Sequence, residues 1–350
     1  MEGFEIMADA REVTTRRLRR LTAAVKAVGQ AGTALGGVWT DGRKPVHVVL
    51  RSHLLQSTSG PGPLVRLVLP RGVALRFYLL AVFEAQCRLA VGGSWVNDRP
   101  LAGVGSWSDF IAIDGAYDTR SGTYMPETKQ GRRGPADLRL RQIQSALKTL
   151  EELGPEQALV TMPRAGKGGR RLYGEFSLMK ENGRGALQTP DIYTVPRNHW
   201  SAATITIPAE FFLNGWVQVL NSSEIATWLI LRGLSQWARD THATSGVYLY
   251  GRPRLEDFGL RRDAWEDGCQ RLREFGLIRH ARNAPLDSEP KGMDIVDVLA
   301  HGRRKQYEPY TWQVTDVGLA EDAVKVCTRE LTLRQKLLDT RAAHRETLSP

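Results

Sequence analysis

The chain has 350 residues, enough for two or three compact domains that each bury a core of their own. Lysine and arginine outnumber aspartate and glutamate by 48 to 38, and the resulting formal charge of +10 favours polyanionic partners. Cys87, Cys269 and Cys327 lie far apart without a CxxC spacing, a pattern that argues against a disulfide framework or a zinc knuckle. We therefore expect no cofactor.

The first 70 residues form an N-terminal extension that begins with a basic helix. Residues 9–28 predict an amphipathic helix, because apolar residues recur there at steps of three and four. The run GQAGTALGG is expected to end it, since glycine at this density favours neither helix nor strand. Two β-rich runs, PVHVVL and PLVRLVLP, follow around the turn-forming spacer STSGPGP. The cationic residues of the helix are Arg11, Arg16, Arg17, Arg19, Arg20 and Lys26.

The longest apolar stretch, VALRFYLLAVFEAQCRLAV, predicts a buried helix. It contains Arg76, Glu84 and Arg88, which are too many charges for a membrane span. The N-terminus carries acidic residues and lacks a signal-like apolar region. These features predict a cytoplasmic, nucleoid-associated protein without membrane contact.

This stretch opens the first of two blocks, residues 71–184 and 208–318, whose element orders match. The first block continues with SWSDFIAI, the insertion DGAYDTRSGTYMPETKQGRRGP and the helix ADLRLRQIQSALKTLEELG. It ends with the strand ALVTMP, the basic segment RAGKGGRR and the strand LYGEFSLM. Residues 185–207 are polar and contain prolines, as expected of an interdomain linker.

The second block repeats this order with different residues. After GWVQVL, a helix is predicted from Ser222 to Arg239, beginning at a capping box of Asn221 and Glu224. RLEDFGLRRDAWEDGCQRLREFGLI then predicts two short helices, a turn and the start of the strand GLIRHAR. A basic loop leads to the strand PYTWQVTD. Residues 319–350 are expected to form a polar helical tail containing Leu331, Leu333, Leu337 and Leu338, which packs back or pairs with another subunit.

Apolar residues give each long helix of the blocks one buried face. Glycine follows both helices, Gly154 and Gly276, and suits the left-handed position just past a helix end. The order of helix, short helix, longer helix, strand, basic loop and strand indicates a mainly α fold with small β wings (α+β), two winged helix-turn-helix domains in tandem. The apolar stripes are Ile143, Leu147 and Leu150 in the first block, and Trp265, Cys269, Leu272 and Phe275 in the second.

The opposite faces of these helices are polar and predict contacts with DNA. Arginine and glutamine pair with guanine and adenine edges, whereas cations on the wings bind phosphates. The candidate helix residues are Arg139, Arg141, Gln142, Ser145 and Lys148 in the first block, and Arg261, Arg262, Asp263, Glu266, Gln270 and Arg273 in the second. The candidate wing residues are Arg164, Lys167, Arg170 and Arg171, and Arg303, Arg304 and Lys305. Double-stranded DNA is favoured over RNA because aromatic residues do not cluster as stacking platforms.

In the phrases LRLRQIQSALKTLEELG and GLRRDAWEDGCQRLREFGLI, and in the order of its elements, the chain resembles the tandem winged-helix replication initiators of plasmids. More loosely it resembles winged-helix transcription regulators. The resemblance covers roughly two thirds of the chain. It implies binding to repeated DNA sites near an origin, a monomer-to-dimer switch, contacts with host replication proteins, and no catalytic residue. The arginine-, alanine- and glycine-rich composition fits an actinobacterial source.

Other chemistries have weaker signals. AGKGGR is not a phosphate loop, because Gly168 follows Lys167 where Ser or Thr is needed to bind magnesium. The seven histidines show neither HExxH nor the triplet used for metal-dependent strand nicking. A transcription regulator remains the first alternative. A metal-dependent nuclease using Asp114 and Glu127, with Thr128 and Lys129 alongside, remains a remote second one.

Overall fold

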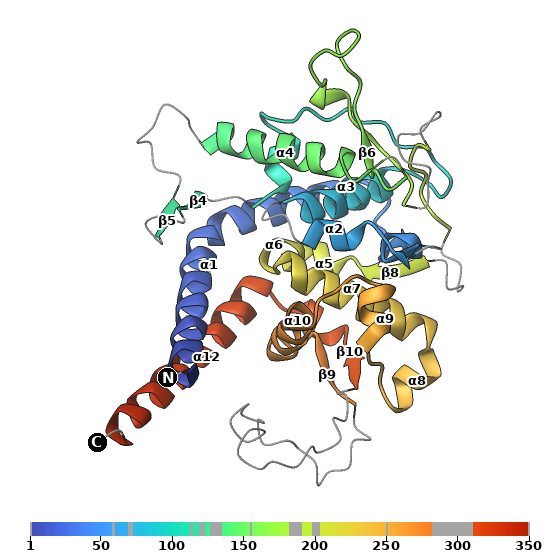
Figure 1. Cartoon of the computed structure of the whole chain (residues 1–350). Helices are drawn as coiled ribbons and strands as arrows, with labels where there is room; N and C mark the ends of the chain where they lie inside the picture. Colours follow the sequence, from blue (N-terminus) through green and yellow to red (C-terminus); the bar gives the residue numbers. More distant parts are fainter. Residues whose placement is uncertain are drawn as a thin grey trace.

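The computed structural model describes residues 2–57, 60–68, 73–112, 115–118, 123–126, 135–154, 156–181, 191–197, 204–249, 251–281 and 311–348. Over these ranges the protein is mainly helical and carries small antiparallel sheets of two strands each (Figure 1). It is therefore an α+β protein, as the sequence predicts.

The elements are as follows. The helices are α1 (Glu2–Asp41), α2 (Leu64–Val68), α3 (Ala74–Arg88), α4 (Pro135–Glu151), α5 (Glu210–Leu213), α6 (Trp216–Val219), α7 (Ser222–Trp237), α8 (Arg239–Thr244), α9 (Gly251–Glu256), α10 (Arg262–Glu274) and α12 (Ala323–Leu348). The 3₁₀ helices are Ser52–Leu54, Trp107–Phe110, Tyr173–Glu175 and Val317–Ala320. The strand pairs are β1 (His47–Arg51) with β8 (Thr204–Pro208), β2 (Gln56–Ser57) with β3 (Gly60–Pro61), β4 (Gly115–Asp118) with β5 (Thr123–Pro126), β6 (Val160–Thr161) with β7 (Ser177–Leu178), and β9 (Ile278–His280) with β10 (Trp312–Val314).

Helix α1 is longer than the sequence predicts. It runs unbroken through the glycine-rich run, so the expected break after residue 28 is wrong. Ala31 and Leu35 are buried there, and Gly32 lies close to α5, where a Cβ would stand 3.7 Å from the carbonyl oxygen of Leu213. This packing outweighs the helix penalty of glycine, which is about 1 kcal/mol per residue. At 1.5 Å per residue the helix is about 60 Å long.

Only the first of the two β-rich runs in the extension is a strand. PVHVVL forms β1, whereas PLVRLVLP contains helix α2, so the second strand prediction is wrong. Leu64 and Leu67 are one helical turn apart, and both are buried. β1 pairs with β8, which begins inside the segment predicted as a linker and connects the extension to the start of the second block.

The two ends of the chain lie together. α1 and α12 pack along each other in antiparallel directions, which Figure 1 shows as a two-helix arm with the termini near its tip. Near the tip, Arg11 Nε lies 2.6 Å from Asp339 Oδ1, and Thr15 Oγ1 lies 3.0 Å from Gln335 Oε1. The C-terminal tail thus packs back on the N-terminal helix, one of the two possibilities predicted.

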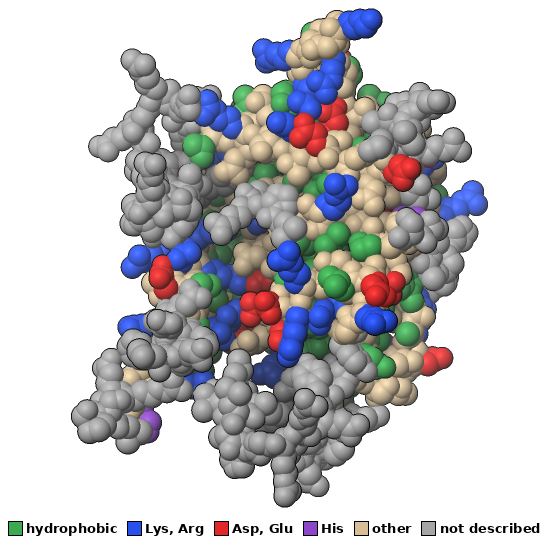
Figure 2. All heavy atoms as spheres, in the orientation of Figure 1, with side chains coloured by type: hydrophobic (Ala, Val, Ile, Leu, Met, Phe, Trp, Pro, Cys, Tyr) green, Lys and Arg blue, Asp and Glu red, His purple; other side chains and the backbone are tan. Residues whose placement is uncertain are grey.

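The first unit, defined as α3, α4 and the hairpin β6–β7, follows the predicted order. α3 is the buried apolar helix, α4 packs on it, and Trp107 of the 3₁₀ helix Trp107–Phe110 contacts Phe77 of α3. The predicted strand LYGEFSLM is shorter than expected, because Tyr173–Glu175 is a 3₁₀ turn and only Ser177–Leu178 forms the strand. The hairpin tip projects from the top of the molecule, where Figure 2 shows lysine and arginine side chains.

The second unit, defined as α7, α9, α10 and the hairpin β9–β10, also keeps the predicted order. The helix predicted from Ser222 is α7, and the backbone N–H of Asn221 donates to Glu224 Oε2 at 2.9 Å, as the capping box requires. α10 packs on α7, and β10 contacts α7 as well. Val247 forms an antiparallel bridge with Trp312 and so extends the hairpin on one side.

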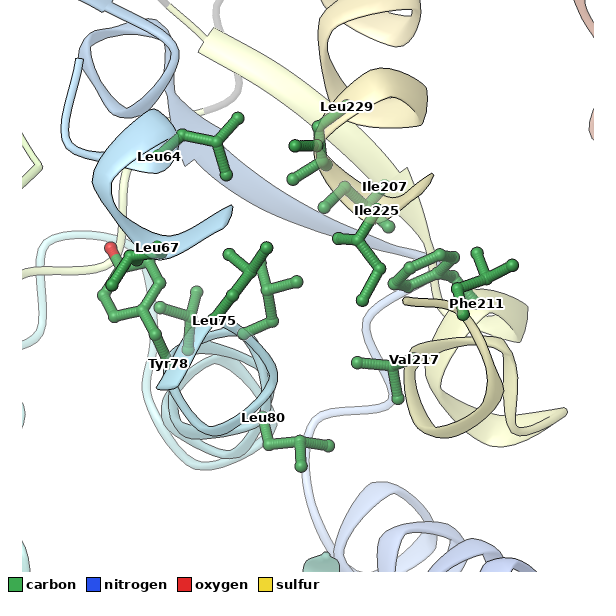
Figure 3. Close-up of a cluster of buried hydrophobic side chains, with 14 of the residues drawn as sticks. Leu64, Leu67, Leu75, Tyr78, Leu80, Ile207, Phe211, Val217, Ile225 and Leu229 are labelled. Carbon is green, nitrogen blue, oxygen red and sulfur yellow. The ribbon is translucent and has the colours of Figure 1, made fainter. Parts of the chain in front are cut away.

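One hydrophobic core joins the two units. It contains side chains from α3 in the first unit and from β8 and α5–α7 at the start of the second block. Figure 3 shows Leu64 and Leu67 of α2 in one cluster with side chains of both groups. Phe83 and Phe212 also stack across the boundary, with 4.7 Å between ring centroids.

Candidate nucleic-acid interface

Helix α10 has one buried face and one exposed face, as its residue spacing predicts. Trp265, Cys269 and Leu272 are buried against the second unit. Gly268 lets α10 approach α7, because an added Cβ would lie 2.5 Å from Thr227 Oγ1. Gly276 ends the helix with a φ of 74°, the left-handed conformation expected at that position.

The outward side of α10 holds every helix residue predicted for DNA contact in the second block. Within it, Arg262 Nε donates to Glu266 Oε1 at 2.7 Å, and Gln270 Nε2 donates to Glu274 Oε1 at 3.1 Å. Arg262 is therefore exposed but already oriented by a neighbouring carboxylate. The exposed residues are Arg261, Arg262, Asp263, Glu266, Gln270 and Arg273.

The hairpin β9–β10 begins directly after α10. His280 stacks on Trp312 with 4.5 Å between ring centroids, and its Nε2 lies 2.7 Å from Nη1 of Arg273 on α10. Burial, and then the charge of Arg273, lower the pKa of His280. The loop residues Arg303, Arg304 and Lys305 lie outside the described residues. The strands β9 and β10 thus lie beside α10, and the prediction of a second wing stays a prediction.

Helix α4 presents a similar surface in the first unit. Ile143, Leu147 and Leu150 are buried, as predicted. On the opposite side Arg141, Ser145 and Lys148 are exposed, and Arg139 and Gln142 are partly exposed. The two arginines singled out as base readers, Arg141 and Arg262, are therefore both at the surface.

The hairpin β6–β7 carries a concentrated positive charge. Arg164 and Arg171 form an antiparallel bridge beyond the strands, and Gly166 and Gly168 turn the chain with φ values of 72° and 77°. Residues 163–171 contain four cations and no carboxylate. Arg164, Lys167 and Arg170 are exposed, so the tip is suited to an anionic partner.

Arg171 is the least exposed of the four cations of this hairpin, although Arg164 Nη2 also lies 3.5 Å from Glu151 Oε2. Its Nε donates to Glu151 Oε2 at 2.6 Å and its Nη2 to Glu152 Oε1 at 2.7 Å, and only 20% of its side chain is exposed. These bonds raise the pKa of Arg171, the bond to Glu151 most of all. Arg171 thus attaches the hairpin to the C-terminal end of α4 and fixes the angle between them.

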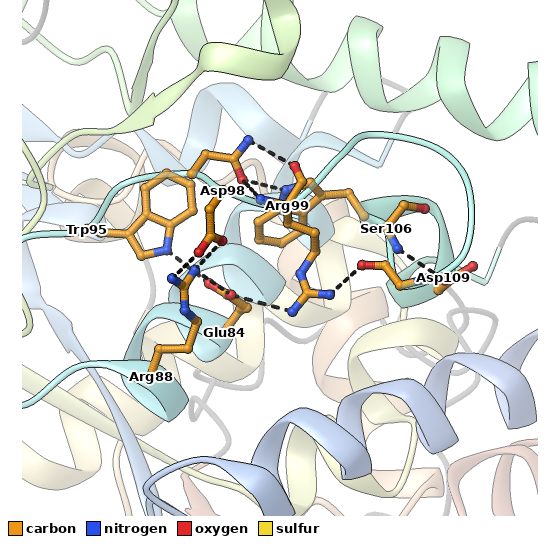
Figure 4. Close-up of polar contacts among 10 residues, drawn as sticks. Glu84, Arg88, Trp95, Asp98, Arg99, Ser106 and Asp109 are labelled. Carbon is orange, nitrogen blue, oxygen red and sulfur yellow. Dashed lines mark hydrogen bonds and ion pairs between the residues drawn. The ribbon is translucent and has the colours of Figure 1, made fainter.

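A buried carboxylate that the sequence analysis did not single out supports the first unit. Glu84 of α3 is fully buried and accepts the indole N–H of Trp95 at 2.9 Å and Arg88 Nη1 at 3.1 Å, and Arg99 Nη2 lies 3.7 Å away (Figure 4). Arg88 also pairs with Asp98 at 2.6 Å. The network anchors the loop between α3 and the 3₁₀ helix Trp107–Phe110, which contacts α4.

The described ranges contain no group of three or more His, Cys, Asp or Glu side chains placed to hold a metal ion. Asp114, Glu127, Thr128 and Lys129, the candidate nuclease residues, lie outside those ranges. Of the helices in the described part of the chain, none is long and apolar enough to cross a bilayer.

Comparisons of the chain with protein-family models, with curated proteins and with solved structures gave no match.

Proposed function

We propose that the chain binds duplex DNA with sequence preference through two tandem winged-helix units, α4 and α10 being the helices that enter major grooves. The observation that carries the proposal is the repeated juxtaposition of an exposed polar helix face with an antiparallel hairpin. A helix fits the major groove of B-form DNA, and a basic hairpin beside it reaches the adjacent phosphates.

The chemistry of the two faces supports recognition of bases. α4 presents Arg141 and Gln142, and α10 presents Arg262 and Gln270. Arginine can donate twice to the edge of guanine, and glutamine can both donate to and accept from the edge of adenine. The exposed cations of the β6–β7 hairpin and the overall charge of +10 supply the attraction to phosphates that is independent of sequence.

Within this class, replication initiation for a plasmid or mobile element is the leading assignment. Two reading units on one chain suit the long repeated sites of an origin, and the element order resembles that of plasmid initiators. Contacts with host replication proteins and dimer formation belong to the same proposal. Plasmid replication that depends on both the gene and the selected DNA site supports it, whereas occupancy of promoters in genomic DNA identifies a transcription regulator instead.

The first test is selection of binding sites from a random-sequence duplex pool, followed by footprinting of the enriched duplex. We expect two protected segments on one face of the DNA, about one helical turn or 34–36 Å apart. Enrichment of a single short half-site per chain contradicts the proposal, as does a pool that remains random.

Single substitutions separate base reading from phosphate binding. Arg262→Ala and Arg141→Ala should each weaken binding to the selected duplex by about 1–3 kcal/mol with little effect on random DNA. Arg170→Ala should weaken both alike and flatten the salt dependence, because it removes a phosphate contact. Arg43→Ala, an exposed arginine in the loop after α1, is the matched control. Equal losses on selected and random DNA for Arg262→Ala contradict its assigned role.

A further inference from the structure

Helix α2 lies between the two candidate DNA-reading units and contacts both. Its buried side chains Leu64 and Leu67 lie in the core that the units share, and the helix contacts both α3 and α7 (Figure 3). Its other two central residues, Val65 and Arg66, are at least partly exposed.

Arg66 connects α2 to the C-terminal end of α4. Its Nη1 donates to the carbonyl oxygen of Leu153, in the turn that ends α4, and lies 3.3 Å from where a Cβ of Gly154 would be. Gly154 has a φ of 110°, so the backbone there has little freedom to accept another residue. The position of α4 is thereby tied to α2.

Val65 connects α2 to the turn between α9 and α10. It packs directly on Gly259, where an added Cβ would lie only 2.8 Å from Val65 Cγ2. Gly259 has a φ of 64°, and the turn it belongs to is closed by the Arg254 guanidinium, whose Nε donates to the carbonyl oxygen of Leu260 at 3.1 Å. The N-terminal end of α10 is therefore also tied to α2.

Further contacts prevent the two units from moving independently. Arg76 Nε of α3 donates to the carbonyl oxygen of Val217 at 2.8 Å, at the end of α6. Gln218 Nε2 donates to the carbonyl oxygen of Phe110 at 2.7 Å, and its Oε1 accepts from the N–H of Ala112 at 3.1 Å. These bonds join α3 and the end of the 3₁₀ helix Trp107–Phe110 to α6, which precedes α7 in the chain.

We propose that Val65 and Arg66 are positioning residues that set the distance and angle between α4 and α10, so that the spacing of the two DNA half-sites is fixed by the fold. This inference rests on the proposed function, because it concerns how two reading units address one duplex. The partner it specifies is B-form DNA with half-sites at a single separation and a single helical phase.

The physical consequence is a strict spacing requirement. Five extra base pairs between the half-sites rotate the second one by about half a turn, and ten extra base pairs restore its face but move it by about 34 Å. Two units joined by a flexible linker tolerate the insertion of ten base pairs, because the linker can span the added distance. Units held by a shared core and by α2 tolerate neither.

The test uses the full chain and the duplex enriched from the random pool, rebuilt with 0, 5 or 10 additional base pairs between its protected segments. We expect affinity to fall about 100-fold or more for both insertions, towards that of an isolated half-site, because the avidity of two linked sites is lost. The selected pool itself should show one spacing only. If the duplex with 10 added base pairs binds within a few fold of the affinity of the duplex without an insertion, and both segments are still protected, the inference is wrong. The proposed function is not affected by that result. Failure to enrich any site overturns the proposed function itself.

A pair of variants then tests whether α2 sets the spacing. Val65→Ala/Arg66→Ala removes both ties and leaves the buried Leu64 and Leu67 in place. We expect this variant to accept half-sites displaced by about one base pair in either direction, because the shared core still holds the units and only their fine position is released. Its affinity for an isolated half-site should stay unchanged. The matched control is Val46→Ala/Arg43→Ala, two exposed residues of the same types in the loop before β1. A spacing profile of the first variant identical to that of wild type overturns the role given to α2.

Discussion

The ion pair between Arg17 and Glu224 gives a stability prediction whose size follows from the structure. Arg17 of α1 donates through Nη1 and Nη2 to the two carboxylate oxygens of Glu224, at 2.5 and 2.7 Å. The side chains are 14% and 3% exposed. The guanidinium also lies over the ring of Phe275, 5.1 Å from its centroid, at the end of α10.

Arg17→Leu leaves the Glu224 carboxylate buried without its counter-charge. Breaking one side of a buried, hydrogen-bonded pair costs about 3–5 kcal/mol. Glu224→Gln keeps the size of the side chain and an oxygen for the capping bond to Asn221, so we expect a smaller loss of about 1.5–3 kcal/mol. The loss of unfolding free energy in the double variant should be smaller than the sum of the two single losses, by up to about 3 kcal/mol. The reason is that both single variants remove the same contact.

The assay is urea unfolding of the four proteins at neutral pH, followed by far-ultraviolet circular dichroism. Arg19→Leu, an exposed arginine on the same helix, is the control, and its free energy of unfolding should stay within about 0.5 kcal/mol of wild type. A loss below about 1 kcal/mol for Arg17→Leu refutes the reasoning, since such values are typical of surface pairs. Strict additivity in the double variant refutes it equally.

Three further predictions concern the helices and the second hairpin. Burial, and then the charges of Arg232 and Arg279, lower the pKa of His242 from 6.5, and its neutral Nε2 accepts the N–H of Val314 at 2.9 Å. The folded protein therefore binds a proton at His242 less readily than the unfolded chain does. The stabilisation from the neutral imidazole is present above about pH 6.5 and is lost as the pH falls below that value. Amide exchange in β10 should accordingly show less protection at pH 5.5 than at pH 7.5. Glu84→Gln should cost about 1.5–3 kcal/mol in urea unfolding, against less than about 1 kcal/mol for Asp98→Asn, whose side chain is exposed. Gly268→Ala should cost about 1–3 kcal/mol through overpacking against α7, and an unchanged unfolding midpoint contradicts the close approach of α7 and α10.

The long helices of the two units could be predicted from sequence because their signals are local and repeated. Trp265, Cys269 and Leu272 recur at steps of four and three, and a glycine with positive φ follows the helix. Such a stripe specifies a buried face whatever it packs against. The exposed positions follow from the same periodicity, which is why Arg141 and Arg262 lie at the surface as expected.

Parts of the site that depend on distant partners could not be predicted in this way. In the sequence Glu84 is a single acidic residue within an apolar helix. Only the fold shows that the indole of Trp95 and the guanidinium of Arg88 donate to it. In the sequence Arg171 is one more cation of a basic loop. Its bond to Glu151 cannot be predicted without knowing where the hairpin folds back onto α4. In both cases sequence supplies the residue type, whereas the fold determines the partner.

The elements that connect the two units are also those with the weakest local signals, and this follows from their role. α2 has five residues, too few to be stable as an isolated helix, and the short apolar run around it is as typical of a buried strand as of a helix. Its buried side chains pack against α3 and α7, so its conformation depends on both units. The same dependence makes it sensitive to their relative position, and any rearrangement of α4 relative to α10 has to break the contacts of Arg66 and Val65. The proposed spacing between half-sites would therefore be a property of the assembled core, which no single stretch of the sequence determines.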